Sequence, residues 1–256
     1  MSALLEISRL SKAYGGVHAV EDVSFALGRG ELLALIGPNG AGKTTCFNML
    51  NGQIRADSGS VRLDGAELLG RRPREIWRMG VGRTFQITAT FTSMTVVENV
   101  QMALISAGRE TFDLFRRATR RHRAEAEALL DRVAMLDQAE RTCGELAYGD
   151  LKRLELAIAL AHRPRLLLMD EPTAGMAPRE RIELMALAAG IVAEQGVSIL
   201  FTEHDMDVVF AHAHRILVLN RGRLIAEGRA DEIRADPLVR EVYLGGGAVF
   251  AEARDA

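Results

Sequence analysis

The sequence has few cysteines and no long apolar run. Its 256 residues include only two cysteines, Cys46 and Cys143, so the chain lacks a disulfide framework and a cysteine metal cluster, as expected in a reducing compartment. No apolar stretch approaches the roughly 18 residues that a membrane-spanning helix needs. The first residues carry a charge, Glu6, inside their apolar run and lack the layout of a signal peptide. Any association with a membrane would therefore depend on a partner.

A large excess of one charge is also missing. The chain has 32 basic and 34 acidic residues and a net charge of −2, which gives no electrostatic case for nucleic acid as the main partner. The apolar share of 48% and the charged share of 26% are ordinary for a globular protein. The length suits one large domain, or a core with a subdomain.

One stretch of the sequence carries a strong chemical signal. The apolar run 32–36 predicts a buried parallel strand, and a helix is predicted from Lys43. Between them, residues 37–44 have the pattern Gly-x-x-x-x-Gly-Lys-Thr. Strand, glycine-rich turn and helix in this order predict a phosphate-binding P-loop, and therefore a nucleoside triphosphate ligand.

Each part of this P-loop has a chemical purpose. Its glycines allow the backbone to approach a phosphate and to turn N–H groups inward, while the helix N-terminus adds a partial positive charge. Lys43 is predicted to reach the β- and γ-phosphates, and Thr44 to bind Mg²⁺. The predicted nucleotide-binding residues of the loop are Gly37, Pro38, Asn39, Gly40, Ala41, Gly42, Lys43, Thr44 and Thr45.

The residues before the P-loop predict antiparallel strands. Segments 4–7 and 17–27 alternate apolar and polar side chains, as half-buried strands do. Tyr14 lies between them. It is either a core or turn aromatic, or a ring that stacks on an adenine base, and the family resemblance given below favours stacking.

From about residue 87 to 157 the sequence pattern predicts mainly helices. Thr95 and Glu98 form a capping-box pattern ahead of one helix. A second helical stretch, 110–136, carries the basic run 116–123, which is either a solvated helix face or a contact for anionic lipid or an acidic partner. A third helix is predicted from Leu151.

Chemically reactive side chains follow two later apolar strands. Asp170 and Glu171 end one strand, and His204 follows the next. Because ligands bind at the edge where parallel strands end, these side chains are predicted to meet the P-loop. Asp170 would hold Mg²⁺ beside Thr44, Glu171 would act as general base, and His204 would contact the γ-phosphate. Singly, such residues are as often helix caps or structural groups; their order after a P-loop favours a hydrolytic site.

Taken together, these segments resemble the ordered motif set of ATP-binding-cassette (ABC) ATPases, from residue 4 to about 228. The segments that carry the resemblance are 37–44, Gln86, 146–150, 167–171 and His204. The resemblance implies an α/β fold with a RecA-like P-loop NTPase core, an antiparallel β-subdomain and an inserted α-helical subdomain. The expected division is 1–86 with 158–228 as the nucleotide-binding core, 87–157 as the helical signature subdomain, and 229–256 as a C-terminal helical appendage and tail.

Two loops depart from the family pattern. Where the family's signature loop is usually Leu-Ser-Gly-Gly-Gln, this chain has residues 146–150, of which only Leu146 and Gly149 match; both are predicted to contact nucleotide. Asp150 is expected to face away from the phosphate and to cap the following helix. In the later loop 174–177, Ala177 stands where the family often has an aspartate, so a carboxylate that commonly couples the two sites is absent.

The resemblance also implies partners. Family members pair head to tail, so that each P-loop faces the signature loop of a second ABC ATPase subunit, here a copy of the chain or a paralogue. ATP and Mg²⁺ are the implied ligands. Integral membrane permease subunits are the implied partners, a solute-binding protein is an indirect one, and nucleic acid is not expected. The implied location is the cytoplasmic face of the cell membrane, as a peripheral subunit.

Gln86 is expected to touch Mg²⁺ or the attacking water and to link the site to the permease. The groove from Gln86 to about Val100, with Phe85, Phe91 and Met94, would receive a permease helix, although these apolar residues also suit a subdomain core.

Within the family, the chain resembles the ATPase subunits of branched-chain amino acid importers. The matching segments are 146–149, 83–86, 203–205 and 229–245. The expected function is ATP hydrolysis that energises uptake of branched-chain or related amino acids. The alternatives are a urea or amide importer, an exporter, and a non-transport ATPase; the last usually has two cassettes or a long coiled coil, neither of which is seen here.

Overall fold

The computed structural model describes residues 3–84, 90–108 and 122–244. Phe85, Gln86 and most of the basic run 116–123 therefore lie outside the described residues. The strands are β1 (Ala3–Tyr14), β2 (Val17–Gly28), β3 (Leu32–Ile36), β4 (Ser58–Leu63), β5 (Ala66–Glu67), β6 (Val81–Thr84), β7 (Leu166–Asp170), β8 (Ser198–Thr202), β9 (Arg215–Asn220) and β10 (Arg223–Gly228). The α-helices are α1 (Lys43–Leu50), α2 (Pro73–Arg78), α3 (Val96–Ala107), α4 (Arg123–Arg132), α5 (Tyr148–Leu160), α6 (Pro178–Gln195), α7 (Met206–His212), α8 (Ala230–Ala235) and α9 (Pro237–Leu244).

A six-stranded sheet in the order β10-β9-β3-β8-β7-β6 forms the centre of the molecule. Strands β9, β3, β8, β7 and β6 run parallel, and β10 is antiparallel at one edge. Every residue of β3, β7 and β8 is buried, which explains why their sequences are mainly apolar. The predicted parallel core is confirmed.

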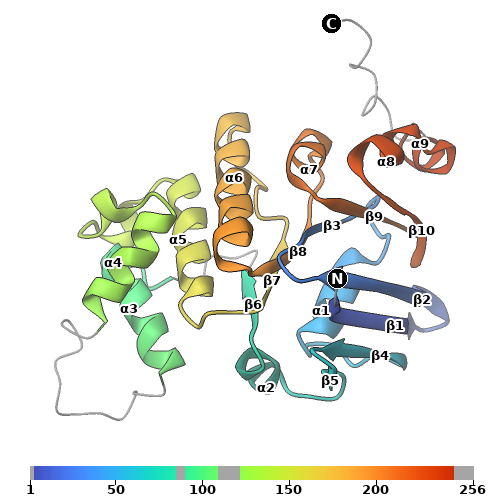
Figure 1. The fold of residues 1–256 in the computed structure, drawn as a ribbon, viewed down its shortest axis with the longest axis horizontal. Helices are drawn as coiled ribbons and strands as arrows, with labels where there is room; N and C mark the ends of the chain where they lie inside the picture. The colour runs from blue at the N-terminus through green and yellow to red at the C-terminus, as the bar shows by residue number, and fades with distance from the viewer. Residues whose placement is uncertain (1–2, 85–89, 109–121, 245–256) are drawn as a thin grey trace, which may run out of the picture.

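The two faces of this sheet pack against different layers. Successive side chains of a strand point to opposite faces. In β3, Leu33 and Leu35 pack with α1 and the four-stranded sheet, whereas Ala34 and Ile36 pack with the helices on the other face. Figure 1 shows α6, α7 and α8 along that second face and α1 between the two sheets. The core therefore has two layers of apolar packing.

A four-stranded antiparallel sheet, in the order β2-β1-β4-β5, lies beside α1. The expected antiparallel subdomain is confirmed, but β1 continues to Tyr14, well beyond the predicted segment 4–7. Irregular register between β1 and β2, with positive φ angles at Arg9 and Asp22, breaks the alternation on which that prediction rested.

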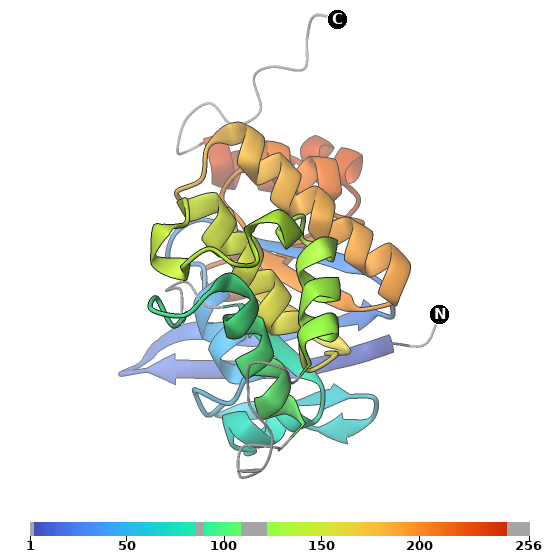
Figure 2. The same ribbon diagram turned by 90° about the vertical axis from the view of Figure 1, so that its left-hand side faces the viewer.

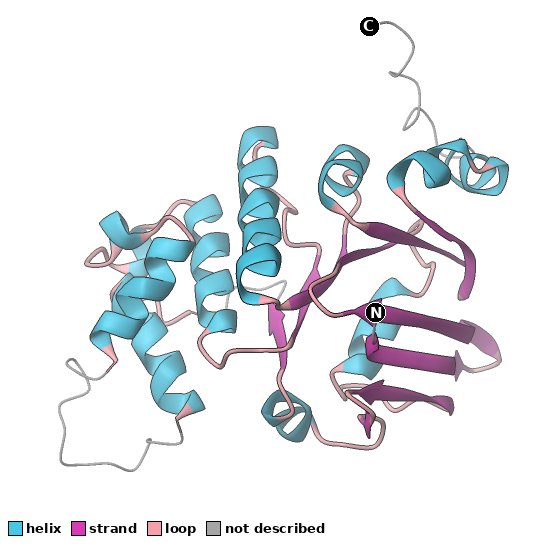
Figure 3. Ribbon diagram, viewed as in Figure 1, coloured by secondary structure: helices cyan, strands magenta, loops and turns pink. Residues whose placement is uncertain are grey.

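The helices α3, α4 and α5 gather on the opposite side of the molecule from this small sheet, as Figure 1 and the helices in Figure 3 show. Figure 2 looks onto this helical group. The predicted capping box is present, since Glu98 N–H donates to Thr95 and Thr95 N–H donates to Glu98. The expected boundary near residue 157 falls inside α5, so the division of the chain into subdomains stays a proposal.

The start of α5 differs from the prediction. The helix begins at Tyr148 with Ala147 at the N-cap position, three residues before Leu151. Asp150 therefore lies in the first turn, and the prediction that it caps the helix is wrong. Its carboxylate still suits this position, because an acid in the first turn is stabilised by the helix dipole.

A helix that crosses a bilayer must be long and predominantly apolar. No helix within residues 3–84, 90–108 and 122–244 is suited to cross a membrane.

Candidate nucleotide site

The P-loop lies between β3 and α1, as the sequence predicts, and it is wedged between backbone segments of both sheets. A Cβ on Gly42 would lie 2.2 Å from the carbonyl oxygen of Ala19 in β2. A Cβ on Gly37 would lie 2.1 Å from the carbonyl oxygen of Leu219 in β9. Gly42 also has a φ of 106°, which favours glycine. The loop shape therefore depends on residues without side chains at these two positions.

Lys43 is buried at the start of α1 and turns back onto the loop. Its Nζ donates to the carbonyl oxygens of Gly37, at 2.7 Å, and Pro38, at 3.2 Å. Burial lowers the pKa of Lys43, and the nearby carboxylates of Glu171 and Asp170 oppose that shift. The ammonium group thus lies close to both predicted acids, and its hydrogen-bond partners among the described residues are neutral carbonyl groups, so an anionic phosphate would be a stronger partner.

Asp170 ends β7 as a buried carboxylate with a partner on each oxygen. Its Oδ1 accepts a hydrogen bond from the Thr202 hydroxyl at 2.8 Å. Its Oδ2 lies 3.1 Å from Nη2 of Arg83 in β6. In the sequence, Arg83 is visible only as part of a subgroup marker, because its contact with Asp170 depends on how β6 and β7 pair.

Glu171 and His204 are in direct contact, as expected for residues at one sheet edge. Oε1 of Glu171 lies 2.7 Å from Nε2 of His204. Glu171 has a φ of 49°, and its N–H donates to the carbonyl oxygen and to the hydroxyl of Thr202, each at 3.1 Å. The strained backbone turns the Glu171 side chain away from the strand and toward the histidine.

A second acid, Glu203, fixes the loops that carry these two residues. Its buried carboxylate accepts the N–H and the hydroxyl of Thr173 at 2.8 and 2.7 Å, and it also accepts the N–H of His204 at 3.2 Å. This connection joins the segment after Glu171 to the segment that carries His204. The sequence showed Glu203 only as part of a subgroup marker.

Arg181, near the start of α6, makes a further connection that the sequence analysis missed. Its Nε donates to the carbonyl oxygen of Met176 at 2.8 Å, and its Nη1 lies 2.8 Å from Oδ2 of Asp205, the N-cap of α7. It therefore joins the 174–177 loop to the helix after His204.

The signature-like loop lies elsewhere in the same chain. Figure 1 places α5 among the helices, with β6 and β7 between it and α1. At the loop, Tyr148 packs beside Gly175 and stays 45% exposed, while Lys152 Nζ lies 5.5 Å from the centre of the Tyr148 ring. Gly149 lies against Glu180, whose Oε1 would be 3.0 Å from an added Cβ. Leu146 is partly exposed and Gly149 is buried, and both lie near the start of α5, away from their own P-loop.

Tyr14 ends β1 and is 48% exposed, so part of its side chain is accessible from outside the protein. Lys12 Nζ lies 5.4 Å from the ring centre and 2.6 Å from Oδ1 of Asp57. A core role for Tyr14 is excluded by this exposure.

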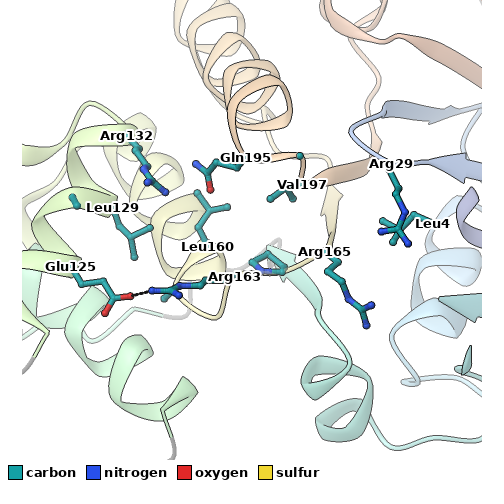
Figure 4. Close-up of a pocket in the computed structure, with 14 residues that line it drawn as sticks. Leu4, Arg29, Glu125, Leu129, Arg132, Leu160, Arg163, Arg165, Gln195 and Val197 are labelled. Carbon is teal, nitrogen blue, oxygen red and sulfur yellow. Dashed lines mark hydrogen bonds and ion pairs between the residues drawn. The ribbon is translucent and has the colours of Figure 1, made fainter. Parts of the chain in front are cut away.

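Another opening lies near the central sheet, at the edge opposite the P-loop. This pocket, of about 480 Å³, is lined by residues that precede β7 and β8 and by one side of α4. Figure 4 shows Arg163 directed at Glu125, while Arg29 and Arg165 both pair with Asp64. Because three of its arginines are already paired, the pocket offers little charge to an anion.

The site offers few protein ligands to a metal ion, which suits a hard cation that also binds the phosphates of the substrate. Among the described residues, no group of three or more His, Cys, Asp or Glu side chains is placed to hold a metal ion. Thr44 and Asp170 supply one hydroxyl and one carboxylate, and Mg²⁺ typically takes one or two such protein ligands together with substrate phosphates and water. These residues therefore fit Mg²⁺ better than a metal that needs a full protein cage.

Comparison with known proteins agrees with this geometry. The pattern of a family described as ABC transporter matches residues 20–174, and that of a family described as Branched-chain amino acid ATP-binding cassette transporter matches residues 223–249. The high-affinity branched-chain amino acid transport ATP-binding protein BraF of Pseudomonas aeruginosa is 41% identical, covering 94% of this chain and 98% of BraF. LivG of Escherichia coli strain K12, described in the same words, is 40% identical with the same coverage.

Solved structures give the same result. An ATP-binding cassette of an ABC transporter in its ADP conformation superposes with a TM-score of 0.85 at 29% identity, covering 96% of this chain and all 100% of that one. A nucleotide-free cassette superposes with a TM-score of 0.83 at 29% identity, covering 94% and 99%. Together with the P-loop and the acids at the strand ends, these matches show that the chain belongs to the ABC transporter family, as one of its ATP-hydrolysing subunits.

Proposed function

We propose that this ATPase energises the import of branched-chain amino acids, or of closely related amino acids or amides. The support is the naming of its relatives, which extends over nearly the full length of both chains, and the match of its last residues to the branched-chain amino acid cassette family. The single structural observation that carries the catalytic part is the contact of 2.7 Å between Glu171 and His204 beside the P-loop.

In the proposed mechanism, ATP lies along the P-loop with its adenine on Tyr14. The N–H groups of residues 37–45 bind the phosphates, and Lys43 exchanges its carbonyl partners for the β- and γ-phosphates. Bound Mg²⁺ would neutralise charge on the phosphates, and Thr44, Asp170 and Gln86 are the residues proposed to hold it or its water. This arrangement fixes the γ-phosphate at the end of β3.

Hydrolysis would use the pair at the ends of β7 and β8. Glu171 accepts a proton from the attacking water, which general-base catalysis makes more nucleophilic. His204, which contacts Glu171 in the structure, turns to the γ-phosphate and holds the water in line. Its exposed fraction of 46% leaves space for that movement.

The site is proposed to be completed by a second ABC ATPase subunit. Leu146 and Gly149 lie away from their own P-loop, so they would contact the ATP bound by the partner subunit, whether a copy or a paralogue. The N-terminal N–H groups of α5, which follow directly, suit a γ-phosphate. Permease subunits would dock beside Phe91, which is 55% exposed, and Met94, and would place the protein at the cytoplasmic face of the membrane, with a solute-binding protein as an indirect partner.

The catalytic assignment is tested by Glu171→Gln, which keeps the shape and removes the base. ATP binding should persist, while turnover should fall by about 10²- to 10⁴-fold. Glu194→Gln, an exposed carboxylate on α6, is the matched control and should hydrolyse ATP normally. Near-normal turnover of Glu171→Gln would exclude Glu171 as the base.

The transport assignment needs a second measurement. Uptake of labelled leucine, isoleucine, valine, other amino acids and urea is compared between cells with the wild-type protein and cells with only Glu171→Gln. Selective loss of the branched-chain amino acids supports the proposal. If the variant lost only the uptake of urea or an amide, the protein would instead serve a urea or amide importer. If it lost export of a substrate, the protein would instead serve an exporter.

A further inference from the structure

We propose that Arg83 is a positioning residue for Asp170: it neutralises this carboxylate in the metal-free protein and thereby weakens the binding of Mg²⁺. The inference rests on the proposed role of Asp170 as a residue of the Mg²⁺ site. Through Arg83, strand β6 would influence how much Mg²⁺ increases the affinity for ATP.

The contact between the two side chains is direct and shielded from water. Arg83 Nη2 lies 3.1 Å from Asp170 Oδ2, and the two side chains are only 14% and 5% exposed. The other carboxylate oxygen is taken by the Thr202 hydroxyl at 2.8 Å. Both oxygens of Asp170 therefore have protein partners, so a cation or its water must share or displace one of them.

The guanidinium group is held in place by two further side chains. Its Nη1 donates to Oδ1 of Asn48 in α1 at 2.9 Å and to Oε1 of Gln53 at 3.1 Å. In the sheet, Arg83 pairs with Leu168, two residues before Asp170. The planar guanidinium, with its several N–H donors, thus connects the P-loop helix with the end of β7. A lysine ammonium group matches this arrangement of acceptors less well.

The charge of Arg83 affects the metal-free protein and the Mg²⁺-loaded protein in opposite directions. In the metal-free protein, removing Arg83 would leave a buried carboxylate without its ion pair, which is strongly unfavourable. In the loaded protein, the divalent cation itself compensates Asp170, and the positive charge of Arg83 nearby is repulsive. Removing Arg83 therefore destabilises the metal-free state more than the loaded state, and by linkage Mg²⁺ must bind more tightly.

The test compares binding of a fluorescent ATP analogue in Mg²⁺ with binding in EDTA. The measured quantity is the ratio of the dissociation constant in EDTA to that in Mg²⁺. In Arg83→Met, which keeps an extended side chain without charge, this ratio should rise at least about fivefold over the wild type, the lower end of typical coupling between two sites. The thermal midpoint of the nucleotide-free protein in EDTA should fall as well.

Three variants make the result specific. Arg83→Gln retains a hydrogen-bond donor and should also raise the ratio, which keeps the test valid if Arg83→Met fails to fold. Arg83→Lys retains the charge and should leave the ratio near the wild-type value. Arg78→Met, at an exposed arginine of α2, should change neither quantity.

The outcomes separate this inference from the proposed function. An unchanged or lower ratio in both Arg83→Met and Arg83→Gln, with a wild type that responds to Mg²⁺, overturns the role of Arg83 alone. A wild type that binds the analogue equally well with and without Mg²⁺ overturns the proposed metal role of Asp170, and this inference with it.

Discussion

Replacing Thr202 by valine removes one hydroxyl group from the centre of the site while it preserves the shape of the side chain. Thr202 is fully buried, with 0% of its surface exposed, and its hydroxyl donates to Asp170 Oδ1 at 2.8 Å. The N–H of Glu171 also reaches this hydroxyl, but it keeps the Thr202 carbonyl oxygen as an acceptor. The variant therefore deprives only the Asp170 carboxylate of a partner.

The expected loss follows from that single contact. A hydrogen bond to a charged group contributes about 1.5–3 kcal/mol, so Thr202→Val should lower the free energy of unfolding by about 2 kcal/mol. For chains of 150–250 residues each kcal/mol corresponds to about 2–4 °C, which gives a decrease of about 4–8 °C in the thermal midpoint. Urea unfolding followed by circular dichroism, in EDTA and without nucleotide, measures the effect.

The matched control is Thr202→Ser, which keeps the hydroxyl and removes a methyl group. It should lose about 0.8 kcal/mol, the value of one buried carbon. If Thr202→Val were no less stable than Thr202→Ser, the hydroxyl would not be supporting Asp170, and the account of the buried carboxylate would be refuted.

Two further predictions concern the P-loop and the helix after it. Gly42→Ala should be much less stable than Gly40→Ala. Both glycines have a positive φ, but a Cβ added at Gly42 would lie 2.2 Å from the Ala19 carbonyl oxygen, whereas a Cβ at Gly40 would meet no atom within 4 Å. Equal thermal midpoints of the two variants would contradict the wedging of the loop. Burial raises the pKa of the Cys46 thiol to about 12, and Cys143 is also buried. Neither thiol should therefore react with a disulfide reagent at pH 8 until the protein is unfolded. Rapid labelling of Cys46 in the native protein would show that α1 opens, and rapid labelling of Cys143 would show that the turn Cys143–Glu145 opens.

The parts of the site that depend on local spacing could be predicted from the sequence. The P-loop pattern specifies strand, turn and helix within 14 residues, and Asp170 and Glu171 directly follow an apolar strand. The structure brings Lys43, Asp170, Glu171 and His204 to one edge because β3, β7 and β8 are neighbours that run parallel. That arrangement follows from a rule of parallel sheets rather than from any one residue.

The contacts that depend on tertiary register could not be predicted in the same way. Arg83 meets Asp170 because β6 is the edge strand beside β7, and nothing local in the sequence specifies which acid an arginine will reach. Glu203 could equally have faced solvent, because a single acid in a loop carries no periodic signal. The early start of α5 was missed since Ala147 offers no side-chain cap.

The wedging of the P-loop makes its surroundings depend on segments that are far apart in the chain. The Leu219 carbonyl lies against Gly37, and the Ala19 carbonyl lies against Gly42. These contacts span 200 positions of the chain. A chain that ended before β9 would therefore lack one of the two backbone segments that pack against the P-loop.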